Sequence, residues 1–407
     1  MEFLRRPSAW WTLFVQAVEI AAQTAIALLS IRVMSVADWG VLAFALYASA
    51  SVSTFIFFGA AEMAILDFAT KSSAPRTILM GVLGVLKKGF LRVFILLLLA
   101  AIFLLRDVEG VVVFGICGAA LMANGAASAF HLPLIANEKA GLGLLPLVAV
   151  RLSQMLLIGG QPLVDGSNLS PIWVAAVHLL GALALGACRA RLVHHFLFKI
   201  SFRSAKGATR DLGERGKCLG YGSIFGQVSN RMDGWMLQGM SNEIEVGGYL
   251  ASVRVLHGLA ALWAAISISV FPKLTKSKSS LSSKWILWTG CSVLPLLWAG
   301  LEAESWVPLL FGADFEFCVP VVRWLLAASA AQAFTAVGAK ILITHGRAKL
   351  WMKIQVVGAL ANFAANLVLI PRFGGLGAAM ATATSSALCT LLFFVWWACK
   401  KRSSADS

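Results

Sequence analysis

The sequence predicts an all-α polytopic membrane protein with about twelve transmembrane helices, in two six-helix lobes related by a pseudo-two-fold axis along the membrane normal. Of the 407 residues, 59% are hydrophobic and only 13% are charged, and the mean hydropathy is +0.82. A soluble protein of this length needs far more charge on its surface. Apolar stretches of about 20 residues recur along the whole chain, and each can cross the ~30 Å hydrocarbon layer as a helix.

The first span follows the amino-terminal segment MEFLRRPSAWW, which has the charge of a signal peptide. The stretch after it carries Gln16, Glu19 and Gln23 and runs on to Arg32, so it is too long and too polar for a signal sequence. We therefore interpret it as a helix that is retained. The predicted spans are Trp10–Val33, Trp39–Phe68, Ile78–Leu105, Gly110–Ala136, Leu142–Gly160, Pro171–Phe196, Leu219–Met240, Val246–Phe271, Lys284–Leu301, Cys318–Thr344, Leu350–Ile370 and Gly377–Cys399.

Basic residues collect in alternate loops, and this asymmetry predicts the orientation. One set of ends and loops contains most of the 34 Lys and Arg residues. The other set contains only Arg32, Arg106 and Arg372 and is otherwise acidic, as in the segments NEIE and ADFE. We expect the basic set to be cytoplasmic, with both termini inside. Charge distributed in this way does not favour a nucleic acid as partner.

The longest cytoplasmic connection divides the spans into six plus six. It is basic and extends roughly from Arg189 to Lys217. The predicted units are an N-terminal lobe of residues 1–198, a linker of residues 199–217 and a C-terminal lobe of residues 218–407. A basic linker at this place is expected to rest on anionic lipid headgroups.

Two segments of the first half resemble two segments of the second half at nearly the same offset. VADWGVLAFALYAS resembles EIEVGGYLASVRVL and aligns Gly40 with Gly247, and LIANEKAG resembles LITHGRAK and aligns Lys139 with Arg347. This similarity predicts a duplicated six-helix unit. Because six is even, both copies have the same orientation, and transporters commonly bind their substrate between such halves.

Polar residues form one stripe along the first span and another along the seventh. The first stripe contains Thr12, Gln16, Glu19, Gln23 and Ser30, and the second contains Ser223, Gln227, Asn230, Arg231, Gly234 and Gln238. Their spacing of three or four residues places each set on one helix face. Hydrocarbon satisfies no polar group, so these faces must meet protein or water. Interhelical hydrogen bonds are one explanation, and a shared aqueous cavity explains both stripes together.

Several ionisable residues are predicted to lie deep in the membrane, where they are costly and usually functional. Arg231 lies about nine residues, or ~13 Å, from the outer end of its span, and Arg254 lies about as deep. Arg151 is near the middle of the fifth span and Arg323 in the outer half of the tenth. Lys340 lies nearer the cytoplasmic end, where its side chain can also extend to the interface.

The intramembrane acids are fewer, chiefly Glu19, Glu62 and Asp233. A cavity with more arginine than carboxylate suits a large anionic substrate, and the planar guanidinium matches phosphate. Arg231 and Asp233 are two residues apart and therefore about 200° apart around their helix. We interpret them as two residues with separate roles: Arg231 contacts an anion, and Asp233 meets a neighbouring helix as a structural partner or a coupling carboxylate.

Other motifs are missing from the sequence. The seven cysteines are scattered without a CxxC pair or a Cys/His cluster, so they indicate neither a metal site nor a disulfide framework. We interpret them as small packing residues. No Walker A, HExxH or GxSxG motif occurs, so we expect no cofactor and no enzymatic activity. The segment GGLGAAMA lacks the context of a dinucleotide motif and is interpreted as close helix packing.

Five segments resemble the Wzx-type lipid-linked oligosaccharide flippases of the multidrug/oligosaccharidyl-lipid/polysaccharide exporter superfamily. They are SIRVMSVADWGVLAFAL, NRMDGWMLQGMSNEIEVGGYLASVRV, FPKL, LFGADFEFCVPVVRWL and LIPRFGGLGAAMATATS, and they occur in the order of the family's helices. The resemblance implies a multi-pass protein of the bacterial inner membrane, with two facing lobes and a cationic cavity. It also implies transport of an undecaprenyl-diphosphate-linked oligosaccharide, the repeat unit of an O-antigen or exopolysaccharide, to the periplasmic leaflet by alternating access.

By this resemblance Arg231, Arg254 and Arg323 would contact the diphosphate or anionic sugars, and Glu19, Glu62 or Asp233 would couple transport to protons or sodium ions. Polysaccharide polymerase and glycosyltransferases are the expected protein partners. A multidrug cation antiporter, a lipid II flippase and a non-transporting scaffold of a polysaccharide-synthesis complex remain alternatives. The antiporter should line its cavity with acids, and the lipid II flippase is expected to have two further helices.

Overall fold

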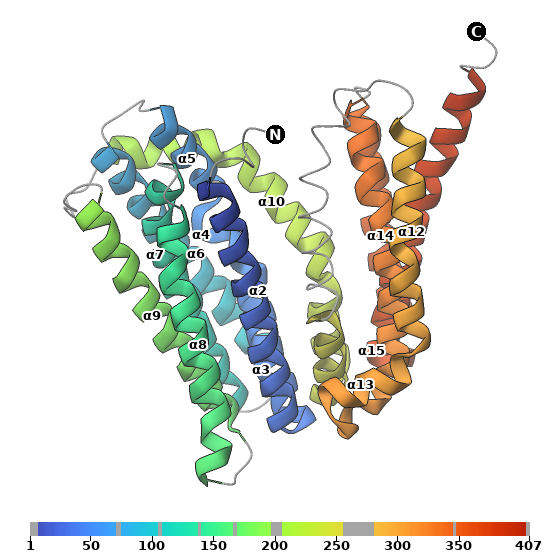
Figure 1. Cartoon of the computed structure of the whole chain (residues 1–407), viewed down its shortest axis with the longest axis horizontal. Helices are drawn as coiled ribbons and strands as arrows, with labels where there is room; N and C mark the ends of the chain where they lie inside the picture. The colour runs from blue at the N-terminus through green and yellow to red at the C-terminus, as the bar shows by residue number, and fades with distance from the viewer. Residues whose placement is uncertain are drawn as a thin grey trace. The chain divides into compact units, whose positions relative to one another are not determined.

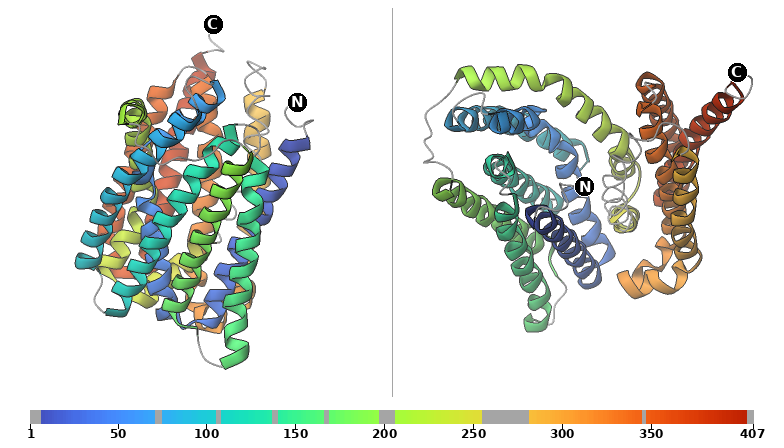
Figure 2. Two further views of the ribbon diagram at one scale, coloured as in Figure 1. Left: turned by 90° about the vertical axis from the view of Figure 1, so that its left-hand side faces the viewer. Right: turned by 45° about the horizontal axis from the view of Figure 1, so that its top comes forward.

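The computed structural model describes residues 7–70, 75–104, 108–136, 140–165, 169–196, 206–254, 281–344 and 347–403. The described chain is almost entirely helical (Figures 1 and 2). It divides into two compact units, Met1–Arg231 and Met232–Ser407. The division falls inside a helix, α10 (Lys206–Met240), and not in the predicted linker.

The first unit is a bundle of long helices that lie side by side (Figure 2). Among them, α7 packs on α9 and α2 packs on α8, and α3, α5 and α6 also pack on α7. Leu147, Leu185 and Ala127 form part of its core. Its helices before α10 are α2 (Pro7–Val33), α3 (Val36–Val52), α4 (Thr54–Phe57), α5 (Ala60–Thr70), α6 (Pro75–Leu104), α7 (Val108–Ala136), α8 (Ala140–Asp165) and α9 (Pro171–Phe196).

The predicted second span is not one helix, because the chain breaks between α4 and α5. Phe58 has a left-handed backbone with φ 49°, and Gly59 follows with φ 79°. Glycines of other helices approach the break closely: a Cβ on Gly89 would lie 1.9 Å from the carbonyl oxygen of Ile56, and one on Gly220 would lie 2.7 Å from that of Phe58. The prediction of a continuous helix here is wrong because these tertiary contacts set the backbone.

Residues 206–217 of the predicted linker are helical and form the first turns of α10. Arg215 donates hydrogen bonds from Nη1 and Nη2 to both carboxylate oxygens of Asp67 on α5. Its Nε also pairs with Asp211 at 3.0 Å. The pKa of Arg215 is raised chiefly by the hydrogen bond to Asp67. This part of α10 is therefore attached to the first unit.

The second unit contains the end of α10, a helix over residues 243–254, and further elements that pack on α14 or on one another. They are α12 (Leu281–Leu301), α13 (Ala303–Phe311), the 3-10 helix η1 (Ala313–Cys318), α14 (Val319–Thr344) and α15 (Ala348–Ser403). The predicted span Val246–Phe271 lies only partly within the described residues, and the segment FPKL lies outside them. The predicted loop after α12 contains α13 and η1.

Helix α15 combines the two last predicted spans across a break at Gly374, whose φ is 55° and ψ is −131°. The carboxylate of Glu245 accepts a hydrogen bond from the backbone N–H of Gly375 at 2.8 Å. A Cβ on Gly377 would lie 2.2 Å from the carbonyl oxygen of Leu369. Small residues are thus required by close packing here, as predicted for GGLGAAMA.

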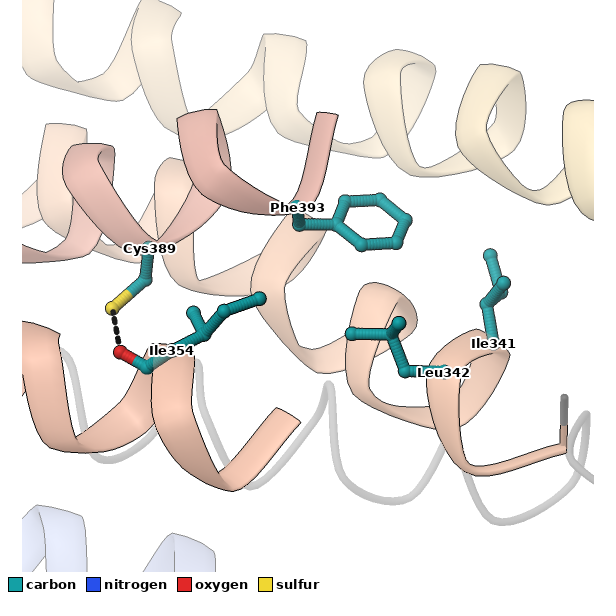
Figure 3. Packing of buried hydrophobic residues seen from close by; sticks show 5 residues of the cluster. All are labelled: Ile341, Leu342, Ile354, Cys389 and Phe393. Atoms are coloured by element: carbon teal, nitrogen blue, oxygen red, sulfur yellow. Dashed lines mark hydrogen bonds between the residues drawn. The ribbon is translucent and has the colours of Figure 1, made fainter. Parts of the chain in front are cut away.

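One end of the second unit is packed around Phe393, with Ile341, Leu342, Ile354 and Cys389 (Figure 3). The thiol of Cys389 donates to the carbonyl oxygen of Ile354 at 3.6 Å. Because lipid is as apolar as these side chains, close packing and small residues hold such helices together more than apolar burial does. The interpretation of Cys389 as a packing residue is confirmed.

Five of the helices in the described ranges are long and apolar enough, by length and composition, to cross a membrane. A sixth is added when α12 and α13, which are bent by 81° at their junction, are counted as one broken span. Most of helix α15, residues Lys349–Cys399, is counted as one of these five helices although it contains two predicted spans. These helices are those of a multi-pass membrane protein.

Candidate functional site

Arg231 and Asp233 lie on α10 and contact different helices. The guanidinium carbon of Arg231 is 5.0 Å from the centre of the Tyr47 ring on α3. Tyr47 is buried, with 6% of its surface exposed, whereas Arg231 is half-buried. A cation at this distance from a ring face is stabilised by the ring's quadrupole. The ring of Tyr47 therefore stabilises the charged side chain of Arg231.

Asp233 is buried. Its carboxylate accepts one hydrogen bond from the N–H of Gly234 at 2.8 Å and another from the hydroxyl of Tyr249. Tyr249 is fully buried on the helix of residues 243–254. The prediction that Asp233 meets a neighbouring helix is confirmed. Arg231 belongs to the first unit and Asp233 to the second, so each charge is bound within its own unit.

Arg151 lies on α8 inside the first unit. Its Nη1 donates to Oε1 of Gln154 at 2.9 Å, and Nε2 of Gln154 donates to the carbonyl oxygen of Val177 on α9 at 3.1 Å. Gln154 is almost completely buried. This chain of hydrogen bonds connects Arg151 to the packing of α8 on α9.

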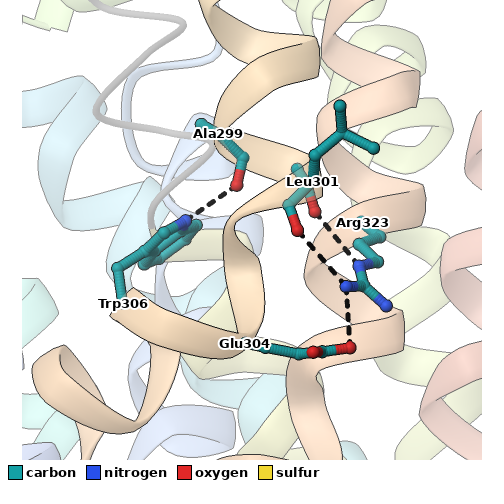
Figure 4. A network of polar contacts seen from close by, with 6 residues as sticks. Ala299, Leu301, Glu304, Trp306 and Arg323 are labelled. Carbon is teal, nitrogen blue, oxygen red and sulfur yellow. Dashed lines mark hydrogen bonds and ion pairs between the residues drawn. The ribbon is translucent and has the colours of Figure 1, made fainter.

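Arg323 lies on α14 and is bound to the junction of α12 and α13 (Figure 4). It donates to the carbonyl oxygens of Gly300 at 3.1 Å and Leu301 at 3.4 Å, and to the carboxylate of Glu304 at 2.9 Å. These contacts give Arg323 a structural role at the end of α12. An anion contact at the same residue stays a prediction.

The other predicted site residues are less fully described. Arg254 is half-buried at the end of the described part of its helix, and Gln23 is exposed on α2. The remaining side chains lie outside the described residues; they belong to Gln16, Glu19, Glu62, Gln227, Asn230 and Lys340.

A polar cluster of the second unit was not predicted from the sequence. Asn366 donates to Oδ1 of Asn362 at 2.7 Å, Asn362 donates to Ser385 at 3.1 Å, and Ser385 donates to the carbonyl oxygen of Thr382 at 3.0 Å. Asn366 is completely buried. Among the described atoms, Oδ1 of Asn366 and Oγ1 of Thr382 have no hydrogen-bond partner. The signal was two asparagines four residues apart in an apolar span.

A second polar seam joins α14 to the end of α15. Thr335 and Thr390 are hydrogen-bonded at 2.9 Å, and Gln332 donates to Ser386 at 3.3 Å. These bonds use neutral groups only. Within the described ranges, no group of three or more His, Cys, Asp or Glu residues could hold a metal ion.

No protein-family model matches the sequence, and no curated protein matches it significantly. Several solved structures do match it. The chain is similar to the lipid II flippase MurJ in an inward closed conformation, with a TM-score of 0.73 and 12% identity over 95% of this chain and 86% of that one. It is also similar to a multidrug resistance MATE family transporter of the MOP superfamily in an inward-facing conformation, with a TM-score of 0.59 and 11% identity over 97% and 94% of the two chains.

An outward-facing MATE transporter matches with a TM-score of 0.53 and 14% identity over 99% of this chain and 98% of that chain. Likeness over nearly the whole length identifies the fold, although the low identities leave the activity open. The chain therefore has the all-α fold that these proteins share, with about twelve membrane helices in two lobes.

Proposed function

We propose that the protein is a flippase that moves an undecaprenyl-diphosphate-linked oligosaccharide from the cytoplasmic to the periplasmic leaflet by alternating access. The observation that carries this proposal is the contact of Arg231 with the ring of Tyr47, in the segment predicted as the seventh span. The guanidinium carbon lies over the ring at 5.0 Å from its centre, and phosphate oxygens bind a guanidinium at its edge through paired N–H donors. We propose that Arg231 contacts the ring and binds a diphosphate at the same time.

The fold supports transport, and its likeness to a lipid II flippase supports a lipid carried by a diphosphate. A lipid II flippase is therefore the alternative nearest to our proposal, because both substrates share that diphosphate. A multidrug cation antiporter is less well supported, since a cationic drug would be repelled by Arg231. A scaffold that transports nothing gains no advantage from a membrane arginine.

We further propose that transport is coupled to a cation bound in the second unit. Oδ1 of Asn366 and Oγ1 of Thr382 are oxygen ligands of the kind that hard cations prefer. Amides and hydroxyls do not titrate near neutral pH, so this cluster suits sodium and not a proton. Asp233, which the sequence predicts as a coupling carboxylate, is the alternative cation ligand in this unit.

The test is transport of defined lipids in vesicles that contain the purified chain. Arg231→Ala should abolish translocation of the oligosaccharide lipid, and in cells it should abolish surface polysaccharide while the protein still inserts in the membrane. Normal polymer in cells that carry this variant would contradict the proposed site. Movement of lipid II but not of other oligosaccharide lipids would identify the alternative, and movement of neither would favour a scaffold.

A further inference from the structure

We infer that α6 binds the phosphate of an anionic phospholipid between Lys88 and Arg92, on the exposed face of the helix. The partner is a lipid of the surrounding bilayer, and the charges favour phosphatidylglycerol. Neither residue belongs to the proposed substrate site, so the inference holds whatever substrate the protein carries. Three observations support it: the depth of Arg92 in the membrane, the lack of an acidic partner among the described side chains, and the contact that fixes its guanidinium.

Arg92 lies well inside the hydrocarbon layer. Helix α6 packs on α7, which is long and apolar enough to cross the membrane. Its last residue, Leu104, is followed closely by Arg106 and Asp107, and these charges predict the membrane boundary at that end. Arg92 precedes Leu104 by about 12 residues, or ~18 Å, in a layer of ~30 Å. Its backbone is therefore ~12 Å inside the opposite boundary, and that of Lys88 is ~6 Å inside.

The two basic residues share one face of α6 with exposed apolar side chains. Lys88 and Arg92 are both exposed, and four residues correspond to about 40° around a helix. Leu91, Ile95 and Leu99 lie on the same side and are 63%, 47% and 46% accessible. An exposed arginine at this depth is costly unless an anion or water reaches it.

No acidic residue neutralises Lys88 or Arg92 among the described side chains. The described ion pairs of the first unit are made instead by Arg215 and Lys217 of α10. Two like charges four residues apart on one helix face repel each other, and a phosphate between them removes this repulsion. Lys87 is also exposed beside them, so the local charge favours an anionic lipid over a zwitterionic one.

The guanidinium of Arg92 is held by Phe58, the residue at the break between α4 and α5. Its central carbon is 5.4 Å from the centre of the Phe58 ring, and Tyr221 of α10 contacts the same ring edge-on at 5.1 Å. The ring stabilises the cation through its quadrupole but has no oxygen or nitrogen to accept hydrogen bonds. A phosphate supplies these acceptors through paired bonds to the guanidinium.

Native mass spectrometry of the purified full-length chain tests this inference, because it resolves individual bound lipids. Phosphatidylglycerol and phosphatidylcholine with the same acyl chains are titrated against the native protein, Arg92→Gln and Arg76→Gln. Arg76 is the matched control, since it is an exposed arginine of the same helix and lies about 16 residues, or ~24 Å, from Arg92.

We expect the native protein to bind phosphatidylglycerol several-fold more tightly than phosphatidylcholine. Arg92→Gln should weaken phosphatidylglycerol binding by about 10-fold, as expected for the loss of a charged hydrogen bond, and Arg76→Gln by less than about twofold. Equal affinity of the native protein for both lipids, no loss in Arg92→Gln, or an equal loss in Arg76→Gln would overturn the inference. Glycerophosphoglycerol, the same headgroup without acyl chains, should compete weakly; competition as strong as that of the whole lipid would show a site for free phosphate esters.

A second measurement keeps both charges in place. A photoreactive benzophenone amino acid replaces either Leu91, next to Arg92, or Leu99, about two turns deeper on the same face. The protein is irradiated in phosphatidylglycerol nanodiscs, and fragmentation of the attached lipid shows whether its headgroup or its acyl chain reacted. We expect headgroup adducts at Leu91 and acyl-chain adducts at Leu99. Headgroup adducts at both positions or at neither would overturn the inference, because the phosphate would not be held at Arg92.

Discussion

Replacing Tyr47 should weaken anion binding through Arg231, and the size of the effect can be worked out from their geometry. The guanidinium carbon is 5.0 Å from the ring centre, and the ring is buried. Such a contact stabilises by about 1–2 kcal/mol when it is partly desolvated. If this contact holds the guanidinium in its binding position, Tyr47→Leu should weaken binding of a diphosphate lipid by about 5- to 30-fold.

Arg231→Ala should have a larger effect, because it removes the hydrogen bonds to phosphate as well. Two charge-assisted hydrogen bonds contribute about 3 kcal/mol or more, which corresponds to a loss of affinity of at least about 100-fold. The double variant should bind no more weakly than Arg231→Ala alone, since Tyr47 acts through the arginine. The assay is binding of a fluorescent undecaprenyl-diphosphate sugar to the protein in nanodiscs.

Two control variants distinguish the positioning of Arg231 by the Tyr47 ring from a general loss of packing in α3. Tyr47→Phe keeps the ring and should change the affinity by less than about twofold. Phe44→Leu alters another buried aromatic of α3, which stacks on Phe114 at 6.1 Å, and should leave anion binding unchanged. The reasoning is refuted if Tyr47→Leu and Arg231→Ala are additive to within ~0.5 kcal/mol, because independent sites add in this way.

Three further predictions concern other parts of the chain. Tyr249→Phe removes a donor from a buried carboxylate and should lower the free energy of unfolding by about 1–3 kcal/mol, measured by thermal unfolding in detergent. Sodium at ~100 times its Kd should stabilise the native protein by about 2.7 kcal/mol but should not stabilise Asn366→Leu; equal sodium effects on both would contradict the proposed cation site. A Cβ on Gly216 would lie 2.8 Å from backbone atoms of the α4–α5 break. Gly216→Leu should therefore detach α10 from α5, which is measured as faster amide hydrogen exchange in these two helices. Gly213→Leu on the same helix enters open space and should have no such effect.

Hydropathy located most helices closely because the cost of leaving polar backbone in lipid fixes where a span can lie. The predicted span Pro171–Phe196 coincides with α9, and the predicted end of the tenth span coincides with the end of α14 at Thr344. Short or strongly charged helices give no such signal. The first turns of α10 were interpreted as a linker because they are basic, and α13 lies between two predicted spans, where no helix was predicted.

The contacts of a side chain were harder to predict than its position along a helix. A helical wheel shows which face a residue occupies, but not which helix packs on that face. Arg323 lies near the start of α14, as its predicted span requires, yet its bonds to Gly300 and Leu301 depend on how α12 ends. The left-handed backbone of Phe58 likewise depends on glycines far away in the sequence, such as Gly89 and Gly220.

In the segment NRMDGWML, two opposite charges share one helix at a spacing of two residues. Arg231 and Asp233 are about 200° apart around α10, so their side chains leave the helix in different directions. Arg231 is stabilised by the ring of Tyr47, and Asp233 by neutral hydrogen-bond donors. Since these partners belong to different compact units, the two charges attach successive parts of one helix to different units. A chain that needed only a neutral pair would place it three or four residues apart; the spacing of two residues is what allows each charge its own partner.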